Sequence, residues 1–219
     1  MTKTNNSPDD MKIAGQYTVA NWREIKATIT PGKPANWELA FKIFFQTRIE
    51  TRYFEPIRLL QKHGENKGEG FAIVALQCSL IEFLASTRTG KSYKHNATDH
   101  ERNYEFKYSS GEKVFKTFLK EIPPFKKHFE PWAECFYKQV RCGLVHEART
   151  KGKWIIRAEP KPKNESVIHW PDKNGKIILY RNNLQKAFET YIDEYGKELT
   201  KCKCLQAAFI RKFDNLCEE

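Results

Sequence analysis

Apolar positions recur at helical spacing from about residue 36 onwards. The first periodic stretch predicts a helix that begins near Asn36, a residue suited to the N-cap, and ends at Gly64. Pro56 lies inside this stretch and is expected to kink or break the helix, because proline lacks a backbone N–H. The apolar positions that define the pattern are Leu39, Ile43, Phe44, Ile57 and Leu60.

Three further helices are predicted in the middle of the chain. The stretch 70–87 is apolar on nearly every side, which is typical of the central helix of a bundle. A polar stretch at 90–110 is expected to be a long loop, and a short amphipathic helix follows at about 115–122. A fourth helix is expected from Pro131, a good first-turn residue, to Gly152, which stops it.

The apolar pattern changes after residue 152. Three short β-like runs follow: Trp154–Ile156, Val167–Trp170 and Ile177–Tyr180. The turn-forming residues 172–175 separate the last two runs, which predicts a β-hairpin. A final long helix is then expected, capped by Asn182 or Asn183 and running to about Leu216.

These elements predict an all-α fold, a bundle of four to five helices with a small β-hairpin insertion before the last helix. The insertion covers about 153–180. Residues 1–12 are polar and are expected to form a flexible tail. Residues 13–35 mix β-forming residues with a turn-rich stretch, and no helix is predicted there. No linker or repeat divides the chain, so 13–219 are expected to be a single domain.

Composition narrows the function classes. Hydrophobic residues make up 40% of the 219 residues and aromatic residues 13%, which excludes a mostly disordered protein. The net charge of +11 indicates either a soluble protein whose charge serves no partner or one that meets polyanions such as nucleic acid or an anionic membrane, and the charge alone does not decide between them. The longest apolar run, Phe71–Leu76, is far shorter than the roughly 20 residues of a membrane span. With no signal peptide visible, we expect a cytoplasmic protein that does not engage a membrane.

The usual metal and cofactor motifs do not occur. There is no phosphate-binding Gly-rich loop, no G-x-S-x-G, no H-E-x-x-H and no C-x-x-C. The six cysteines are expected to be reduced thiols. Cys202 and Cys204 form a C-x-C pair inside the predicted last helix, which would place them on different faces. We predict neither a metal nor a cofactor.

The string Arg141-Cys142-Gly143-Leu144-Val145-His146 carries the strongest candidate chemistry. RNA can be cleaved without metal when the 2′-hydroxyl attacks the neighbouring phosphate. Histidine is suited to moving the protons of this reaction, and arginine offers a permanently charged fork of donors to the phosphate. Positions 141 and 146 differ by about 140° around a helix, so the two side chains splay apart. The helix end or a second subunit must bring them together, which predicts a homodimer.

The same string resembles the R-x4-6-H signature of the HEPN superfamily of small α-helical bundles. The phrases QTRIETRYFEPI, GEGFAIVALQCSLIEFL and FYKQVRCGLVHEARTKGKW resemble one bacterial branch of that superfamily, and the resemblance covers about 36–216. It implies a HEPN-like bundle and a metal-independent ribonuclease with Arg141 and His146 as catalytic residues. It also implies a dimer in which two motifs face one cleft, in a toxin, phage-defence or stress system with an antitoxin or defence-system partner.

The family often has Asn, Asp or His directly after the arginine, whereas this chain has Cys142. The leading prediction is therefore RNA cleavage, and a catalytically inactive RNA-binding protein is the first alternative. The second alternative is a protein–protein interaction module with a basic surface.

Other charged and aromatic residues are candidates for structural or RNA-binding roles. Glu82 lies on an otherwise apolar helix and needs a partner such as Arg48, Arg52 or Arg141, because an unpaired buried charge is costly. With Glu50, these residues form either an internal ion network or part of an RNA cleft. Tyr137 either stacks on a base or covers the core. The cations near the β insertion either bind RNA or form a solvated face; they are Lys151, Lys153, Arg157, Lys161 and Lys163.

Overall fold

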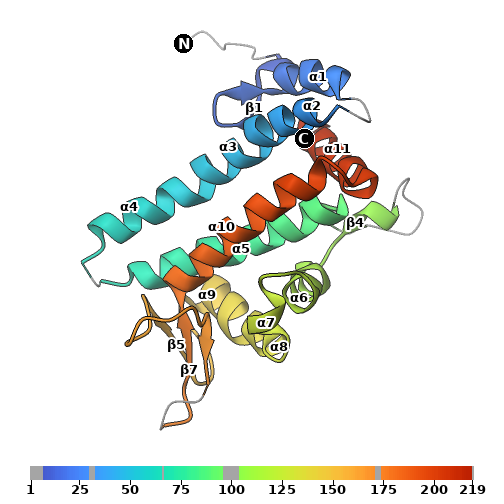
Figure 1. Cartoon of the computed structure of the whole chain (residues 1–219). Helices are drawn as coiled ribbons and strands as arrows, with labels where there is room; N and C mark the ends of the chain where they lie inside the picture. The colour runs from blue at the N-terminus through green and yellow to red at the C-terminus, as the bar shows by residue number, and fades with distance from the viewer. Residues whose placement is uncertain (1–6, 30–32, 66, 96–103, 171–173, 219) are drawn as a thin grey trace. The chain divides into compact units, whose positions relative to one another are not determined.

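The computed structural model describes residues 7–29, 33–65, 67–95, 104–170 and 174–218. Its helical content is 67%, and several small sheets accompany the helices. The prediction of a mainly helical chain is confirmed. Figure 1 traces the order of the elements along the chain.

The chain divides into two compact units. Unit 1 contains Met1–Pro56, Ser86–Ser109 and Glu194–Glu219, and unit 2 contains Ile57–Ala85 and Ser110–Asp193. The predicted single domain over 13–219 stays a prediction.

The N-terminal part of the chain is more ordered than its sequence indicates. The elements are η1 (Pro8–Asp10), β1 (Lys12–Ala14), β2 (Tyr17–Thr18) and α1 (Val19–Thr28). The predicted tail over 1–12 is therefore wrong for residues 8–12, and residues 1–6 lie outside the described residues. Helix α1 was not predicted. It is started by a capping box in which the Thr18 hydroxyl accepts from the Asn21 amide and the Asn21 side chain accepts from the Thr18 amide.

The first predicted helix is observed, but it contains two π-helical segments. Its parts are α2 (Pro34–Ala40), η2 (Phe41–Gln46), α3 (Thr47–Ile49), η3 (Glu50–Phe54) and α4 (Glu55–His63). It begins at Pro34 after Lys33, so the predicted N-cap at Asn36 is wrong. Pro56 does not break the helix. The π-helical turn directly before it changes the hydrogen-bond register, so that the helix continues without the proline N–H.

Aromatic packing holds unit 1 together. Trp22 of α1 meets Phe44 edge-on with ring centroids 5.1 Å apart, and Phe44 lies 6.0 Å from Phe213. Phe213 belongs to α11 (Lys203–Glu218) and stacks close to Phe209. The Trp22 indole also donates to Asp214 at 2.9 Å. The buried rings thus join three segments that are far apart in the sequence.

The predicted final helix is in fact two helices. Helix α10 (Arg181–Leu199) ends before Thr200, and α11 begins at Lys203. The break is stabilised because the Gln206 side chain donates to the carbonyl of Leu199 and caps the end of α10. The predicted asparagine cap is also wrong. Asn183 is buried inside α10, and its amide donates to the carbonyls of Asn164 and Ser166.

The predicted loop at 90–110 contains short regular elements. Strand β3 (Ser92–Tyr93) pairs in parallel with β4 (Lys107–Tyr108), and η4 (Tyr104–Phe106) precedes β4. The rest of this predicted loop, 96–103, lies outside the described residues.

The predicted second helix is confirmed as α5 (Glu69–Thr89). By length and composition alone α5 could cross a membrane, but 56% of its most apolar 18-residue window is buried in the protein, as in a core helix. The buried residues include Ile73, Val74, Leu80 and Ile81.

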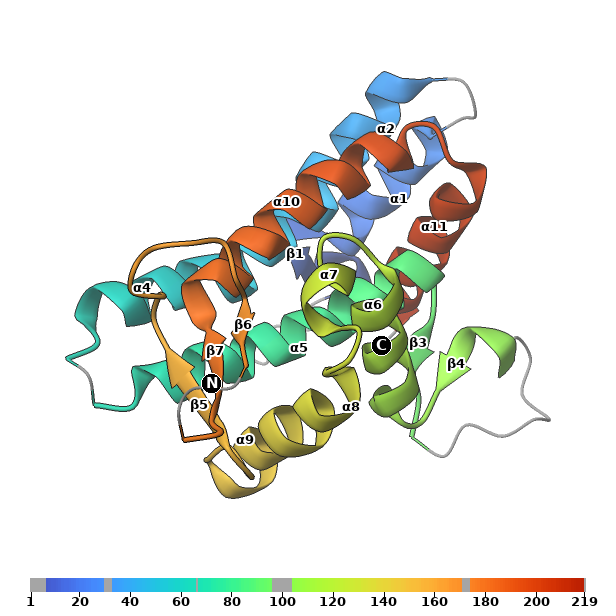
Figure 2. The ribbon, with the colours of Figure 1, turned by 60° about the horizontal axis from the view of Figure 1, so that its bottom comes forward.

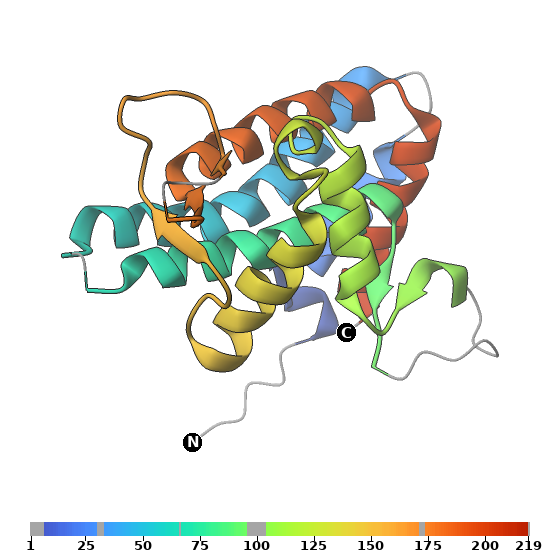
Figure 3. The ribbon, with the colours of Figure 1, turned by 90° about the horizontal axis from the view of Figure 1, so that it is seen from below.

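The predicted third helix is α6 (Gly111–Glu121), and the predicted fourth helix is divided. After the short α7 (Lys126–Phe129), which was not predicted, its parts are α8 (Ala133–Cys135), the π-helical η5 (Phe136–Arg141) and α9 (Cys142–Glu147). The expected end at Gly152 is wrong, because Ala148 adopts the left-handed conformation and closes the helix. The chain then turns back, and the Lys151 amide donates to the Gln139 carbonyl at 2.7 Å. Figure 3 shows the chain leaving this helix for the next strand.

The β insertion is a three-stranded mixed sheet. It consists of β5 (Trp154–Arg157), β6 (Ile168–His169) and β7 (Ile177–Tyr180). Strand β7 lies between the other two, antiparallel to β6 and parallel to β5, as Figure 2 shows. The predicted hairpin is confirmed by the β6–β7 pair, although 171–173 of its turn lie outside the described residues. Phe136 of η5 packs against Trp154 and attaches the sheet to the helices of unit 2.

Candidate functional site

Arg141 lies at the end of η5 and faces α5. Its Nη2 is 3.3 Å from Oε2 of Glu82, and the two side chains are only 24% and 20% exposed. The guanidinium also lies over the Tyr137 ring, 5.4 Å from the centroid. Burial by itself lowers the pKa of Arg141, but Tyr137 and Glu82 outweigh it and raise the pKa above its ordinary value. Among the three arginines that the sequence offered as partners of Glu82, the structure pairs Arg141 with it.

The surroundings of Glu82 explain how a carboxylate is accommodated on an apolar helix. A Cβ atom at Gly111 would lie 2.5 Å from Oε1 of Glu82, so the carboxylate sits directly against the first residue of α6. The positive end of a helix dipole stabilises an anion at that position. Glu82 thus has both a cation and a helix terminus beside it, in agreement with the internal ion pair predicted for it.

The other residues near Arg141 belong to the core. Tyr137 is 9% exposed and meets Phe115 edge-on at 5.3 Å, which places its ring in the packing between η5 and α6. Cys78 is fully buried, and burial raises its pKa to about 12 although Arg141 acts in the opposite direction. Cys78 is therefore a neutral thiol at physiological pH.

His146 lies on the other side of the same helix. It is exposed near the C-terminal end of α9, and its side chain takes part in no hydrogen bond or ion pair within the described parts of the chain. Arg141 faces α5 and is half-buried, whereas His146 is exposed. This difference agrees with the splayed arrangement that the spacing of the two positions predicts. One copy of the chain leaves His146 open to solvent.

The cations after α9 differ in their pairing. Lys151 forms a 2.5 Å ion pair with Glu147, and this hydrogen bond lowers the pKa of Glu147. Lys153 and Arg157 are exposed and form no ion pair among the described residues. Of Lys151, Lys153 and Arg157, the last two therefore have their charges available for RNA.

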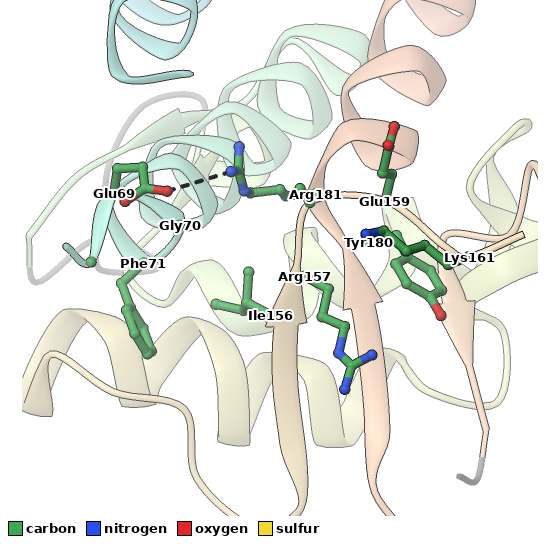
Figure 4. A pocket seen from close by; sticks show the side chains of 11 residues that line it. Glu69, Gly70, Phe71, Ile156, Arg157, Glu159, Lys161, Tyr180 and Arg181 are labelled. Carbon is green, nitrogen blue, oxygen red and sulfur yellow. Dashed lines mark ion pairs between the residues drawn. The ribbon is translucent and has the colours of Figure 1, made fainter. Parts of the chain in front are cut away.

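Arg157 also lines a cavity of unit 2, of about 630 Å³, between the start of α5 and the β insertion. Figure 4 shows Phe71 and Arg157 on either side of Ile156, and Lys161 near Tyr180. Phe71 is 42% exposed. Such a volume lies within the range of about 300–1,000 Å³ that is usual for ligand sites. The cavity is thus lined by an exposed ring and by two cations, Arg157 and Lys161, which are residue types that bind single-stranded nucleic acid.

An ion pair forms one wall of this cavity. Arg181 Nη2 lies 3.6 Å from Oε1 of Glu69, and both side chains are 12% exposed. Oε2 of Glu69 is buried without a hydrogen-bond partner among the described residues. Sequence reasoning did not select Glu69, Phe71 or Arg181, because nothing in the local pattern distinguishes a cavity-lining residue from a residue of the helix surface or core.

The predicted residues of unit 1 lie elsewhere. Arg48 donates to the carbonyl of Ile13, and Arg52 donates to the carbonyl of Lys12 at 3.4 Å. Both arginines thus attach the helix to β1. Glu50 is half-buried on η3. A role of Arg48 and Arg52 in RNA binding stays a prediction.

Comparison with known proteins adds no family. No protein-family model matches the chain, and no curated protein or solved structure does so either. Among the described residues, no three His, Cys, Asp or Glu side chains gather in a way that could hold a metal ion. The function must therefore be argued from the residues themselves.

Proposed function

We propose that the protein is a metal-independent endoribonuclease with a HEPN-like bundle, in which Arg141 and His146 of two copies act on one RNA strand. The observation that carries this proposal is His146, which is exposed and has no hydrogen-bond or ion-pair partner among the described residues, five positions after the half-buried Arg141. A histidine without an internal partner is available to a substrate. The proposed setting is the cytoplasm of a prokaryote, in defence or stress, with an antitoxin or defence-system partner.

The reaction would use the RNA 2′-hydroxyl as its nucleophile. His146 takes the proton of this hydroxyl, whose oxygen then attacks the adjacent phosphorus. The bond from phosphorus to the 5′-oxygen breaks, and that oxygen leaves with a proton. The products are a 2′,3′-cyclic phosphate and a 5′-hydroxyl end. Arg141 stabilises the additional negative charge on the phosphate oxygens.

A second copy would supply what one chain lacks. Arg141 and His146 of a single chain point in different directions, whereas one phosphate must contact both groups. In a dimer with a twofold axis, any contact that brings His146 of one copy to Arg141 of the other would occur twice, which would give two equivalent pairs. The available charges of Lys153 and Arg157 would guide the strand toward that pair.

Binding of RNA along the β insertion can be tested separately from cleavage. Arg157→Gln is expected to weaken binding of single-stranded RNA about three- to tenfold and to reduce the slope of log K against log salt by about 0.7. Phe71→Ala is expected to weaken binding by a similar factor without changing that slope, because stacking releases no counterions. Fluorescence anisotropy over a salt series measures both effects, with exposed Lys186→Gln as the control. Equal slopes for the wild type and Arg157→Gln would contradict a phosphate contact at Arg157.

The second candidate is an RNA-binding protein without cleavage activity. The Glu82–Arg141 ion pair favours this second candidate. The Glu82 carboxylate already contacts one N–H donor group of the Arg141 guanidinium, and a phosphate would need those donors. HEPN proteins often have Asn, Asp or His directly after the motif arginine, whereas this chain has Cys142. This difference also favours a protein without cleavage activity.

Cleavage in the presence of a chelator separates the candidates. The purified chain is incubated with mixed single-stranded RNA in EDTA, and the ends of the products are identified by mass spectrometry. We expect 2′,3′-cyclic phosphate and 5′-hydroxyl ends from the wild type. Binding without cleavage would favour the second candidate. The absence of both would favour an interaction module that binds an acidic protein.

A further inference from the structure

Two cysteines meet where α10 gives way to α11. The sulfur atoms of Cys202 and Cys204 are 2.7 Å apart. Cys204 is exposed and Cys202 is partly exposed, so both can be reached from solvent. The expectation that these residues lie on different faces of one helix is wrong. Helix α10 ends at Leu199 and α11 begins at Lys203, so Cys202 lies between the two helices.

The local backbone explains the contact. The Cys202 amide donates to the Glu198 carbonyl at the end of α10, while the Cys202 carbonyl accepts from the Gln206 amide at the start of α11. Cys202 is thus the last residue before α11, and Cys204 lies in the first turn of that helix. The nonhelical backbone at Cys202 turns its side chain toward Cys204.

We propose that Cys202 and Cys204 form a thiol–disulfide exchange site that reacts with small-molecule disulfides and cycles between a dithiol and an intramolecular disulfide. A disulfide requires a sulfur–sulfur distance of about 2.05 Å, so a small rotation of the side chains closes the remaining gap. The site is independent of the proposed ribonuclease activity and belongs to unit 1 alone.

The exchange proceeds in two balanced steps. The Cys202 thiolate attacks one sulfur of the disulfide, forms a mixed disulfide and releases the first thiolate, which takes up the proton that Cys202 lost. Cys204 then loses its proton and attacks the Cys202 sulfur, which closes the internal disulfide and releases the second thiolate, again with a proton. The two cysteines are oxidised by two electrons, and the small disulfide is reduced to two thiols.

The surroundings make Cys202 the attacking group. The contact with the Cys204 thiol is the largest cause that lowers the pKa of Cys202, and the backbone N–H of Leu205 in the first turn of α11 acts in the same direction. The same contact raises the pKa of Cys204. The charge of Glu198 acts in the opposite direction and raises the pKa of Cys202. A disulfide between Cys202 and Cys204 would be exposed to solvent. Exposed disulfides are reduced readily, and the site can therefore return to the dithiol.

Oxidised glutathione is the probe for this site. The reduced full-length chain is incubated with it, quenched with N-ethylmaleimide, cut with chymotrypsin and analysed by mass spectrometry. For the wild type we expect a disulfide between positions 202 and 204 as the main product, with no retained glutathione. Cys204→Ser should retain one glutathione on Cys202, because the second step is blocked. Cys202→Ser should react with glutathione about tenfold more slowly than Cys204→Ser.

Cys217 provides the matched control in the same unit. Burial raises its pKa to about 11, so Cys217→Ser should leave the exchange unchanged. Circular dichroism of each variant checks that the fold is retained. Equal glutathione addition at Cys202, Cys204 and Cys217, or the absence of a 202–204 disulfide in the folded wild type, would overturn the proposal.

Discussion

Replacing His146 with alanine is expected to lower the rate of RNA cleavage about 100- to 10,000-fold, because a positioned proton-transfer group contributes a factor of that size. His146 is exposed and makes no contact within the described residues that the fold depends on, so the free energy of unfolding should change by less than about 0.5 kcal/mol. Single-turnover cleavage of a labelled RNA in EDTA measures the rate, and urea unfolding measures the stability.

A neighbouring variant controls for changes at the helix surface. Val145 is 56% exposed beside His146, and Val145→Ala should cleave RNA within about twofold of the wild type. RNA binding by His146→Ala should remain within a few-fold of the wild type. If cleavage by His146→Ala stays within tenfold of the wild type while the fold is intact, His146 is not the proton-transfer group.

Arg141→Ala is expected to lower the free energy of unfolding by about 2–3 kcal/mol. The substitution leaves Glu82 partly buried without its cation, and breaking a buried pair from one side costs more than the pair itself contributes. The 20% exposure of the Glu82 side chain and the contact of its carboxylate with the N-terminus of α6 reduce this cost below that of a fully buried charge. Urea unfolding with a constant m-value measures the change.

A double-mutant cycle separates the structural role of Arg141 from its role toward RNA. In a Glu82→Gln background, Arg141→Ala should cost less than about 1 kcal/mol, because no uncompensated carboxylate remains. Glu82→Gln alone should keep cleavage, since Arg141 is still present and more of its donors are available. Loss of cleavage in a folded Glu82→Gln variant would show that the ion pair itself positions Arg141. The same cost in both backgrounds would contradict coupling between the two residues.

The candidate site was only partly predictable. Arg141 and His146 were found by their spacing, and the spacing also predicted that the two side chains would splay apart. The partner of Glu82 remained open among three arginines, because a pattern on one helix does not show which cation packs against it. Arg48 and Arg52 illustrate this limit: their charges suggested a carboxylate or phosphate, and the structure shows that both also donate to backbone carbonyls of β1.

The errors in the predicted elements have a common physical cause. By local rules for helix ends, Pro56 was expected to kink or break its helix and Asn182 or Asn183 to cap one; no break occurs at Pro56, and neither asparagine is the cap. The π-helical turn before Pro56 and the buried hydrogen bonds of Asn183 depend on packing that those rules do not include. Helix α1 was missed because its start depends on a Thr18–Asn21 capping box within a stretch of β-forming residues.

The sequence by itself determined the mainly helical character of the chain, the β6–β7 hairpin and the position of Arg141 and His146 near the end of a late helix. These features follow from periodicity and turn residues, which act over a few neighbouring positions. Only the tertiary structure decided that Glu82 pairs with Arg141, that Phe71 and Arg157 line one cavity, and that Cys202 meets Cys204 at a helix break. Such contacts depend on which surfaces the folded chain buries together, and no local pattern specifies that choice.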